Sequence, residues 1–92
     1  MTIKQKDGEN EKASKLNRNG VFRINCRTIK KDFENLFGDR PSRPPKGGII
    51  EGPWKFDEKD KIMPHTVYGW AGWMCVINPT KKTFEQFFET FR

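Results

Sequence analysis

The strongest constraint on the fold is an apolar segment that runs directly into an amphipathic helix. Residues 73–77, Trp-Met-Cys-Val-Ile, are apolar at every position, which is typical of an interior strand with both faces covered. Asn78 and Pro79 predict a helix start, because asparagine caps helices and proline suits the first helical position. The helix predicted over about 79–91 has one apolar stripe, formed by Phe84, Phe87, Phe88 and Phe91.

A second strand-then-helix unit precedes this one. Residues 21–26 alternate between apolar and polar side chains, which predicts a half-buried strand with Arg23 and Asn25 on the solvent face. Thr28 predicts the cap of a helix over about 28–37, and Gly38 its end. The apolar stripe of this helix is Ile29, Phe33, Leu36 and Phe37. The two units predict an α+β fold, a small and mainly antiparallel sheet with two amphipathic helices on one face.

The remaining sequence predicts one small domain over residues 1–92. Residues 1–20 form a polar leading segment that begins with a short strand, and residues 38–53 form a loop that holds four of the six prolines. Only 34% of the residues are apolar, so the core is thin even though eight phenylalanines enlarge it. We therefore expect a homo-oligomer, most simply a dimer, in which a partner covers apolar surface.

Neither a signal peptide nor a twenty-residue apolar run is present, so the sequence favours a cytoplasmic protein without a membrane partner. In that compartment cysteines stay reduced, and Cys26 and Cys75 are expected to be buried small hydrophobes. A metal site needs three or four ligands, whereas the chain has one histidine and no close cysteine pair. No metal or other cofactor is expected.

The net charge of +6 lies in the first half of the chain. Residues 1–47 carry twelve Lys or Arg and six Asp or Glu, whereas residues 48–92 carry six of each. Such asymmetry fits nucleic acid or another acidic partner, and it equally fits a solvated surface that keeps a small protein in solution. The weak candidates for an anion site surround a helix start: Arg23, Arg27, Lys30 and Lys31.

Residues 61–79 concentrate the side chains that could do chemistry. His65 is a weak candidate for a catalytic residue, with Asp57 or Asp60 as a helper carboxylate. The alternative is a histidine in a turn that hydrogen-bonds the backbone. Tyr68 and Trp70 are weak candidates for ligand binding, and the alternative is that they cover an edge of the core.

Several segments together resemble an uncharacterised family of bacterial proteins known only as a domain of unknown function. The resemblance rests on R-N-G-V-F-R-I-N at 18–25, M-P-H-T-V-Y-G-W at 63–70 and W-M-C-V-I-N-P at 73–79. It covers nearly the whole chain and implies no activity. Asn19 and Thr66 stand where members often have proline. Members usually continue further at the N-terminus, so the chain resembles the C-terminal part of the family domain.

A weaker likeness of layout points to YjbR/MmcQ-type domains, whose fold is associated with nucleic-acid binding; this is an analogy of fold only. Three functions stay open at this point. The sequence favours a non-enzymatic binding or interaction domain with a basic N-terminal half. The alternatives are a small-molecule-binding domain or enzyme around His65, Tyr68 and Trp70, and a purely structural homo-oligomeric domain.

Overall fold

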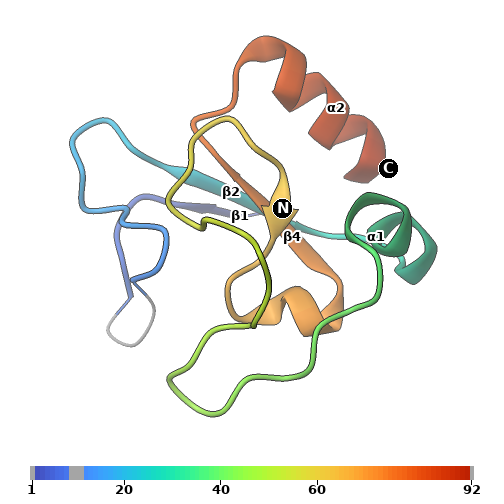
Figure 1. Cartoon of the computed structure of the whole chain (residues 1–92). Coiled ribbons are helices and arrows are strands. Elements are labelled where there is room, and N and C mark those ends of the chain that lie inside the picture. The colour runs from blue at the N-terminus through green and yellow to red at the C-terminus, as the bar shows by residue number, and fades with distance from the viewer. Residues whose placement is uncertain (1, 9–11, 92) are drawn as a thin grey trace.

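The computed structural model describes residues 2–8 and 12–91, with side chains up to Glu89. Its described part holds a four-stranded antiparallel sheet in the order β1-β2-β4-β3 (Figure 1). The strands are β1 (Thr2–Lys4), β2 (Arg23–Arg27), β3 (Met63–Pro64) and β4 (Trp73–Ile77). The helices are α1 (Lys30–Phe37), α2 (Lys81–Phe91) and the short 3-10 helix η1 (Tyr68–Ala71). The α+β fold predicted from the sequence is confirmed.

Strand β4 is interior, as its continuous apolar sequence predicted. It pairs with β2 on one side and β3 on the other, and Cys75 lies opposite both Asn25 and Met63. Its residues from Met74 to Ile77 are buried, while Trp73 is only half-buried. Both faces of this strand are therefore packed against other segments. The two helices lie on one face, and segments without secondary structure lie on the other.

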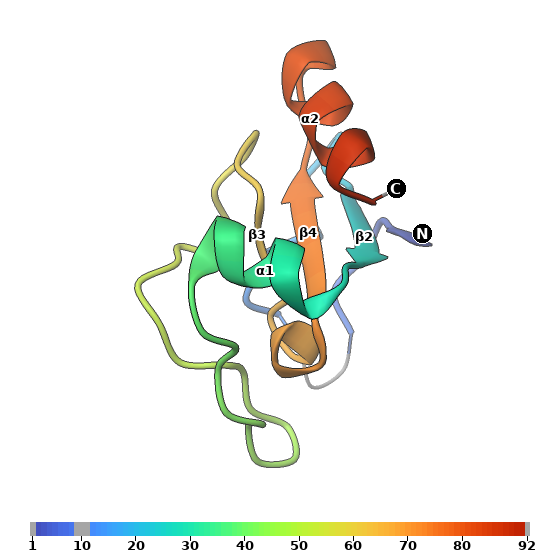
Figure 2. The same cartoon turned by 90° about the vertical axis from the view of Figure 1, so that its right-hand side faces the viewer.

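The two helices cover one face of the sheet (Figure 2). Phe87 of α2 is 1% exposed, and Phe37 of α1 packs against the same cluster. From the strands this cluster takes the side chains that alternate onto the helical face: Ile24, Cys26, Met74 and Val76. Only part of each predicted apolar stripe is buried, because Leu36, Phe84 and Phe88 remain 43%, 37% and 44% exposed.

Both helices begin two residues later than the sequence predicted. Thr28 does not cap α1: its N–H bonds to Gly72 O at 2.8 Å and its hydroxyl donates to Ile29 O, so it stays tied to the turn before β4. Gly38 ends α1 as predicted, with φ +84° and its N–H on Glu34 O.

The start of α2 is moved by Asn78, which has a left-handed φ of +44°. Its side chain does not cap the helix and instead accepts from Phe22 N–H and donates to Gly20 O, both at 2.9 Å. Thr80 takes the cap position, where its hydroxyl accepts from Thr83 N–H.

The second face of the sheet is also buried, which corrects the half-buried strand predicted for β2. Arg23 is 1% exposed and Asn25 4% exposed, because segments without secondary structure lie over them. The loop of residues 38–62 is joined to the turn that follows β3 by Ile50 N–H, which donates to Thr66 O at 2.8 Å. Apolar cover on this face comes from Leu16, Ile50 and Phe56, and Ile50 and Phe56 cluster with Met63 of β3 and Cys75 of β4.

Cys26 and Cys75 are buried and form no disulfide, as expected. Burial raises the pKa of the Cys26 thiol to about 12, so this sulfur is not a nucleophile at neutral pH. Among residues 2–8 and 12–91, the helices are too short and too polar to cross a membrane.

Candidate functional site

A cavity of about 470 Å³ opens on the loop-covered face, beside β1 and β2. This volume lies within the range of small-molecule pockets. Strand β1 contributes Lys4, β2 contributes Arg23 and Asn25, and the segment after β3 contributes His65 and Tyr68. The cavity therefore draws together residues from the beginning, the middle and the later part of the chain.

Arg23 forms the buried floor of this cavity. Its Nη1 donates to Ser14 Oγ at 2.9 Å, and its Nη2 lies 3.3 Å from His65 Nε2. An arginine in a strand would normally extend into water, since a buried guanidinium is costly unless its donors are engaged. Ser14 and the segment around it create the environment in which Arg23 stays inside.

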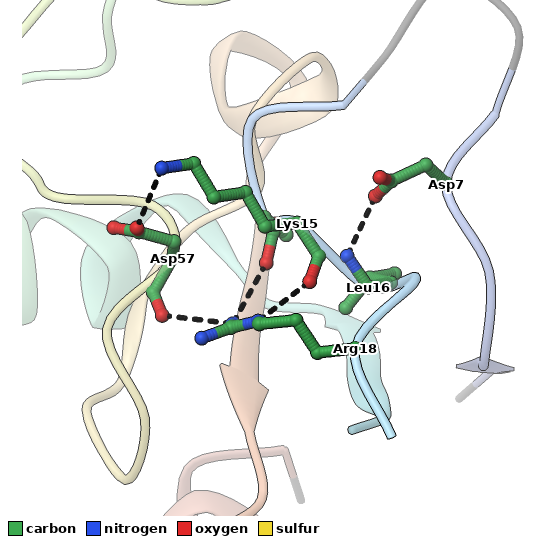
Figure 3. A network of polar contacts seen from close by, with 6 residues as sticks. Asp7, Lys15, Leu16, Arg18 and Asp57 are labelled. Carbon is green, nitrogen blue, oxygen red and sulfur yellow. Dashed lines mark hydrogen bonds and ion pairs between the residues drawn. The ribbon is translucent and has the colours of Figure 1, made fainter. Parts of the chain in front are cut away.

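Ser14 is held by a polar clip that joins residues 14–18 to Asp57 (Figure 3). Arg18 Nη2 donates to Ser14 O and to Asp57 O, each at 3.1 Å, while Lys15 Nζ lies 3.3 Å from Asp57 Oδ2. Asp7 accepts from Leu16 N–H at 2.7 Å and ties the same segment to the chain after β1. The clip fixes the position of the Ser14 hydroxyl against Arg23.

His65 continues the β3 ladder and turns its ring into the cavity wall. Its backbone N–H donates to Trp73 O at 2.9 Å, and its Nδ1 accepts from the N–H groups of Val67 and Tyr68, both at 3.1 Å. These two bonds assign the ring proton to Nε2 in the neutral imidazole. Nε2–H and the Arg23 guanidinium are then two donors side by side, and one acceptor could contact both.

Two of the described residues that line the cavity, Lys4 and Arg23, are cations. Burial, and then the charges of Arg23 and Lys4, lower the pKa of His65 to about 3, so the ring is neutral at physiological pH. Lys4 and Arg23 lie directly opposite each other on β1 and β2. Like charges in such a pair destabilise a sheet. Among the described residues, the titratable side chains that line the cavity are Lys4, Arg23, His65 and Tyr68.

Tyr68 stands at the rim of the cavity, where its side chain is 53% exposed. Its ring centroid lies 5.3 Å from that of His65, at an angle of 43° between the planes. Trp70 does not join them, because its ring packs under the Arg43 guanidinium at 4.9 Å. Gly69 between them is tightly enclosed: a Cβ there would lie 2.8 Å from Ile50 Cδ1.

The other residues singled out in the sequence lie apart from the cavity. Asp57 belongs to the clip, and Asp60 Oδ1 accepts from Thr80 N–H at 2.7 Å, a bond that lowers the pKa of Asp60. Arg27, Lys30 and Lys31 are exposed, unlike Arg23, and Lys30 lies 3.8 Å from Glu34.

Two residues of the site were not found by sequence reasoning, Lys4 and Ser14. The leading strand did carry a usable signal, because pairing β1 with β2 places Lys4 beside Arg23. Ser14 lies in an irregular polar segment that has no periodic pattern.

Comparison with known proteins gives one match. No curated protein and no solved structure is significantly similar to this chain. The model of one family matches it over residues 1–92, and that family is described only as a family of unknown function. This match agrees with the resemblance seen in the sequence. The chain therefore belongs to the family of unknown function DUF6194.

Proposed function

We propose that this protein is a non-enzymatic binding domain for a small organic anion, held in the cavity above Arg23. The observation that carries this proposal is the direct opposition of Lys4 and Arg23 on the cavity wall. Two cations lie side by side at this position, and a carboxylate or phosphate bound there would attract both of them.

His65 supports the same proposal from the other side of Arg23. Its Nδ1 is engaged by two backbone N–H groups, so the proton on Nε2 is available as a neutral donor. A ring held neutral adds directionality to the site without adding a third full charge. Oxyanions accept several hydrogen bonds, and a site with one guanidinium, one ammonium and one imidazole N–H suits that capacity.

A small anion fits the distribution of charge better than a nucleic-acid backbone. Arg23 is buried, whereas Arg27, Lys30 and Lys31 are exposed, so these cations do not form one continuous surface. A catalytic His65 would need a carboxylate beside it as a helper. Asp57 instead pairs with Lys15, and Asp60 accepts from Thr80 N–H.

The first test is a titration of the protein with acetate and with inorganic phosphate, followed by amide chemical shifts. We expect saturable shifts at Lys4, Arg23, Val67 and Tyr68. Lys4→Gln should weaken binding roughly fivefold, because one partly exposed cation is lost. The same substitution should leave the free energy of unfolding unchanged or raise it, since it removes the like-charge pair.

Lys6→Gln is the matched control, because Lys6 is exposed, lies just beyond β1 and does not line this cavity. It should bind both anions as the wild type does. Arg23→Met should abolish saturation, and circular dichroism would establish that it folds. Absence of saturable shifts in the wild type, or equal losses in the Lys4 and Lys6 variants, would refute the anion site.

A second candidate function, self-association, is favoured by the exposed phenylalanines of α2. The rings of Phe84 and Phe88 stack with centroids 6.3 Å apart, and both side chains are more than a third exposed. The chain of α2 is also self-complementary, with Lys81 and Lys82 at its start and Glu85 and Glu89 further along. Two antiparallel copies of α2 would place cations opposite carboxylates, as a twofold interface requires.

Light scattering at micromolar concentration tests this candidate. We expect the mass of a dimer for the wild type and of a monomer for Phe88→Glu, because a carboxylate in the centre of the interface would lack a partner. Lys46→Glu introduces a glutamate on the exposed loop instead and should remain dimeric. A monomeric wild type would rule out self-association through α2.

A further inference from the structure

We infer that the natural ligand is an aromatic oxyanion, a planar ring joined to a carboxylate or phosphate, with the anionic group at Arg23 and the ring against Tyr68. This inference rests on the proposed anion site and specifies its ligand class. Two observations support it: the size of the cavity, and the residues that line the cavity beside Lys4 and Arg23.

The cavity is much larger than an oxyanion requires. Its volume is about 470 Å³, whereas one water occupies about 30 Å³ in the liquid. A carboxylate or phosphate group at Arg23 and Lys4 would leave most of this space unfilled. The remaining space must accommodate the organic part of the ligand.

Apolar and aromatic surface lines that remaining space. Tyr68 is 53% exposed, and both Tyr68 and Val67 line the cavity. The Tyr68 ring is tilted against the His65 ring, which limits its freedom to turn away. An exposed, braced aromatic face at a cavity wall suits stacking by a planar ring, which contributes beyond its buried area.

The wall contributed by the loop after α1 is built from glycine backbone. Gly47 and Gly48 line the cavity, and Gly47 has φ +80°, a conformation that residues with a Cβ rarely adopt. Without side chains at these positions, a flat group can enter between the loop and Tyr68. The cationic floor and the flat, apolar entrance thus define the two ends of one ligand.

The test compares matched pairs of probes by the same chemical-shift titration: benzoate with acetate, and phenyl phosphate with inorganic phosphate. We expect the aromatic member of each pair to bind about three- to tenfold more tightly. The preference for carboxylate or phosphate then identifies the anionic group. Cyclohexanecarboxylate, which has a similar apolar area without a planar ring, should bind more weakly than benzoate.

Variants of Tyr68 separate this inference from the anion site itself. Tyr68→Leu should remove the advantage of benzoate while acetate binds as before, and Tyr68→Phe should keep it because the ring remains. If acetate binds through Lys4 but benzoate and cyclohexanecarboxylate bind alike, the aromatic ligand is refuted and the anion site stands. If none of the anions binds, both are refuted.

Discussion

Acidification is expected to destabilise this protein well above the pH at which its carboxylates titrate. The pKa of His65 falls from 6.5 to about 3 on folding, through burial and the neighbouring Arg23 and Lys4 charges. Between these values the unfolded chain binds a proton that the folded protein does not. The free energy of unfolding therefore falls as pH decreases through this window, by about 1.4 kcal/mol per unit.

Between pH 6.5 and about pH 4 this linkage amounts to roughly 3 kcal/mol, a large part of the stability of a small domain. Urea unfolding at a series of pH values measures it. His65 is the chain's only histidine, so His65→Gln should make the profile nearly flat down to about pH 4.5. Asp60→Asn, which removes a carboxylate with a lowered pKa, should alter only the more acidic region. A flat wild-type profile would contradict a buried neutral His65.

A bound anion should oppose this loss. An oxyanion beside His65 would stabilise the imidazolium and raise the folded-state pKa, so the protein saturated with ligand should lose less stability on acidification. The pH profile with and without benzoate thus connects the stability of the fold to the proposed site.

Replacement of Phe87 by alanine is expected to cost about 3–5 kcal/mol, the range for large-to-small changes of aromatic residues in cores. Phe87 is 1% exposed and is the contribution of α2 to the cluster with Ile24, Cys26, Met74 and Val76. A domain of this length has a total stability of roughly 5–14 kcal/mol. The variant should therefore be only marginally folded, as measured by its thermal and urea midpoints.

Phe84→Ala provides the matched control on the same helix. Phe84 is 37% exposed, its ring stacks with that of Phe88, and it is not part of the buried cluster that contains Phe87, so the expected cost is within about 1 kcal/mol. Equal losses in the two variants would mean that α2 is held to the sheet in a different way.

The sequence predicted the helical half of the molecule well because that half follows simple periodic patterns. Continuous apolar residues placed β4 in the interior, and Phe87 lies at the centre of the stripe that covers it. The exact helix starts could not be predicted, because Thr28 and Asn78 form hydrogen bonds with segments distant in the sequence. Such bonds compete with capping and have no local signature.

The loop-covered half was harder to predict, and the site lies in that half. The alternation in β2 correctly predicted that Arg23 and Ile24 lie on opposite faces of the sheet. The rule that polar side chains face water wrongly predicted that Arg23 is exposed. Its burial depends on the irregular segments that carry Ser14 and Ile50, which have no period to recognise. His65 and Tyr68 were recognised by residue type, whereas their relation to Lys4 required the pairing of β1 with β2.

The strand order has a consequence for how the molecule reaches its native state. The central pair β2 and β4 joins residues as far apart in the chain as Arg23 and Ile77, with α1 and the long loop between them. Folding that depends on such distant pairings is slow, typically milliseconds to seconds, because a large loop must close before any contact compensates its entropy. His65 joins Lys4 and Arg23 only when this closure is complete, because His65 is held to the sheet through β4. The complete anion site is therefore expected only in the native state, and partially folded forms should not bind the ligand.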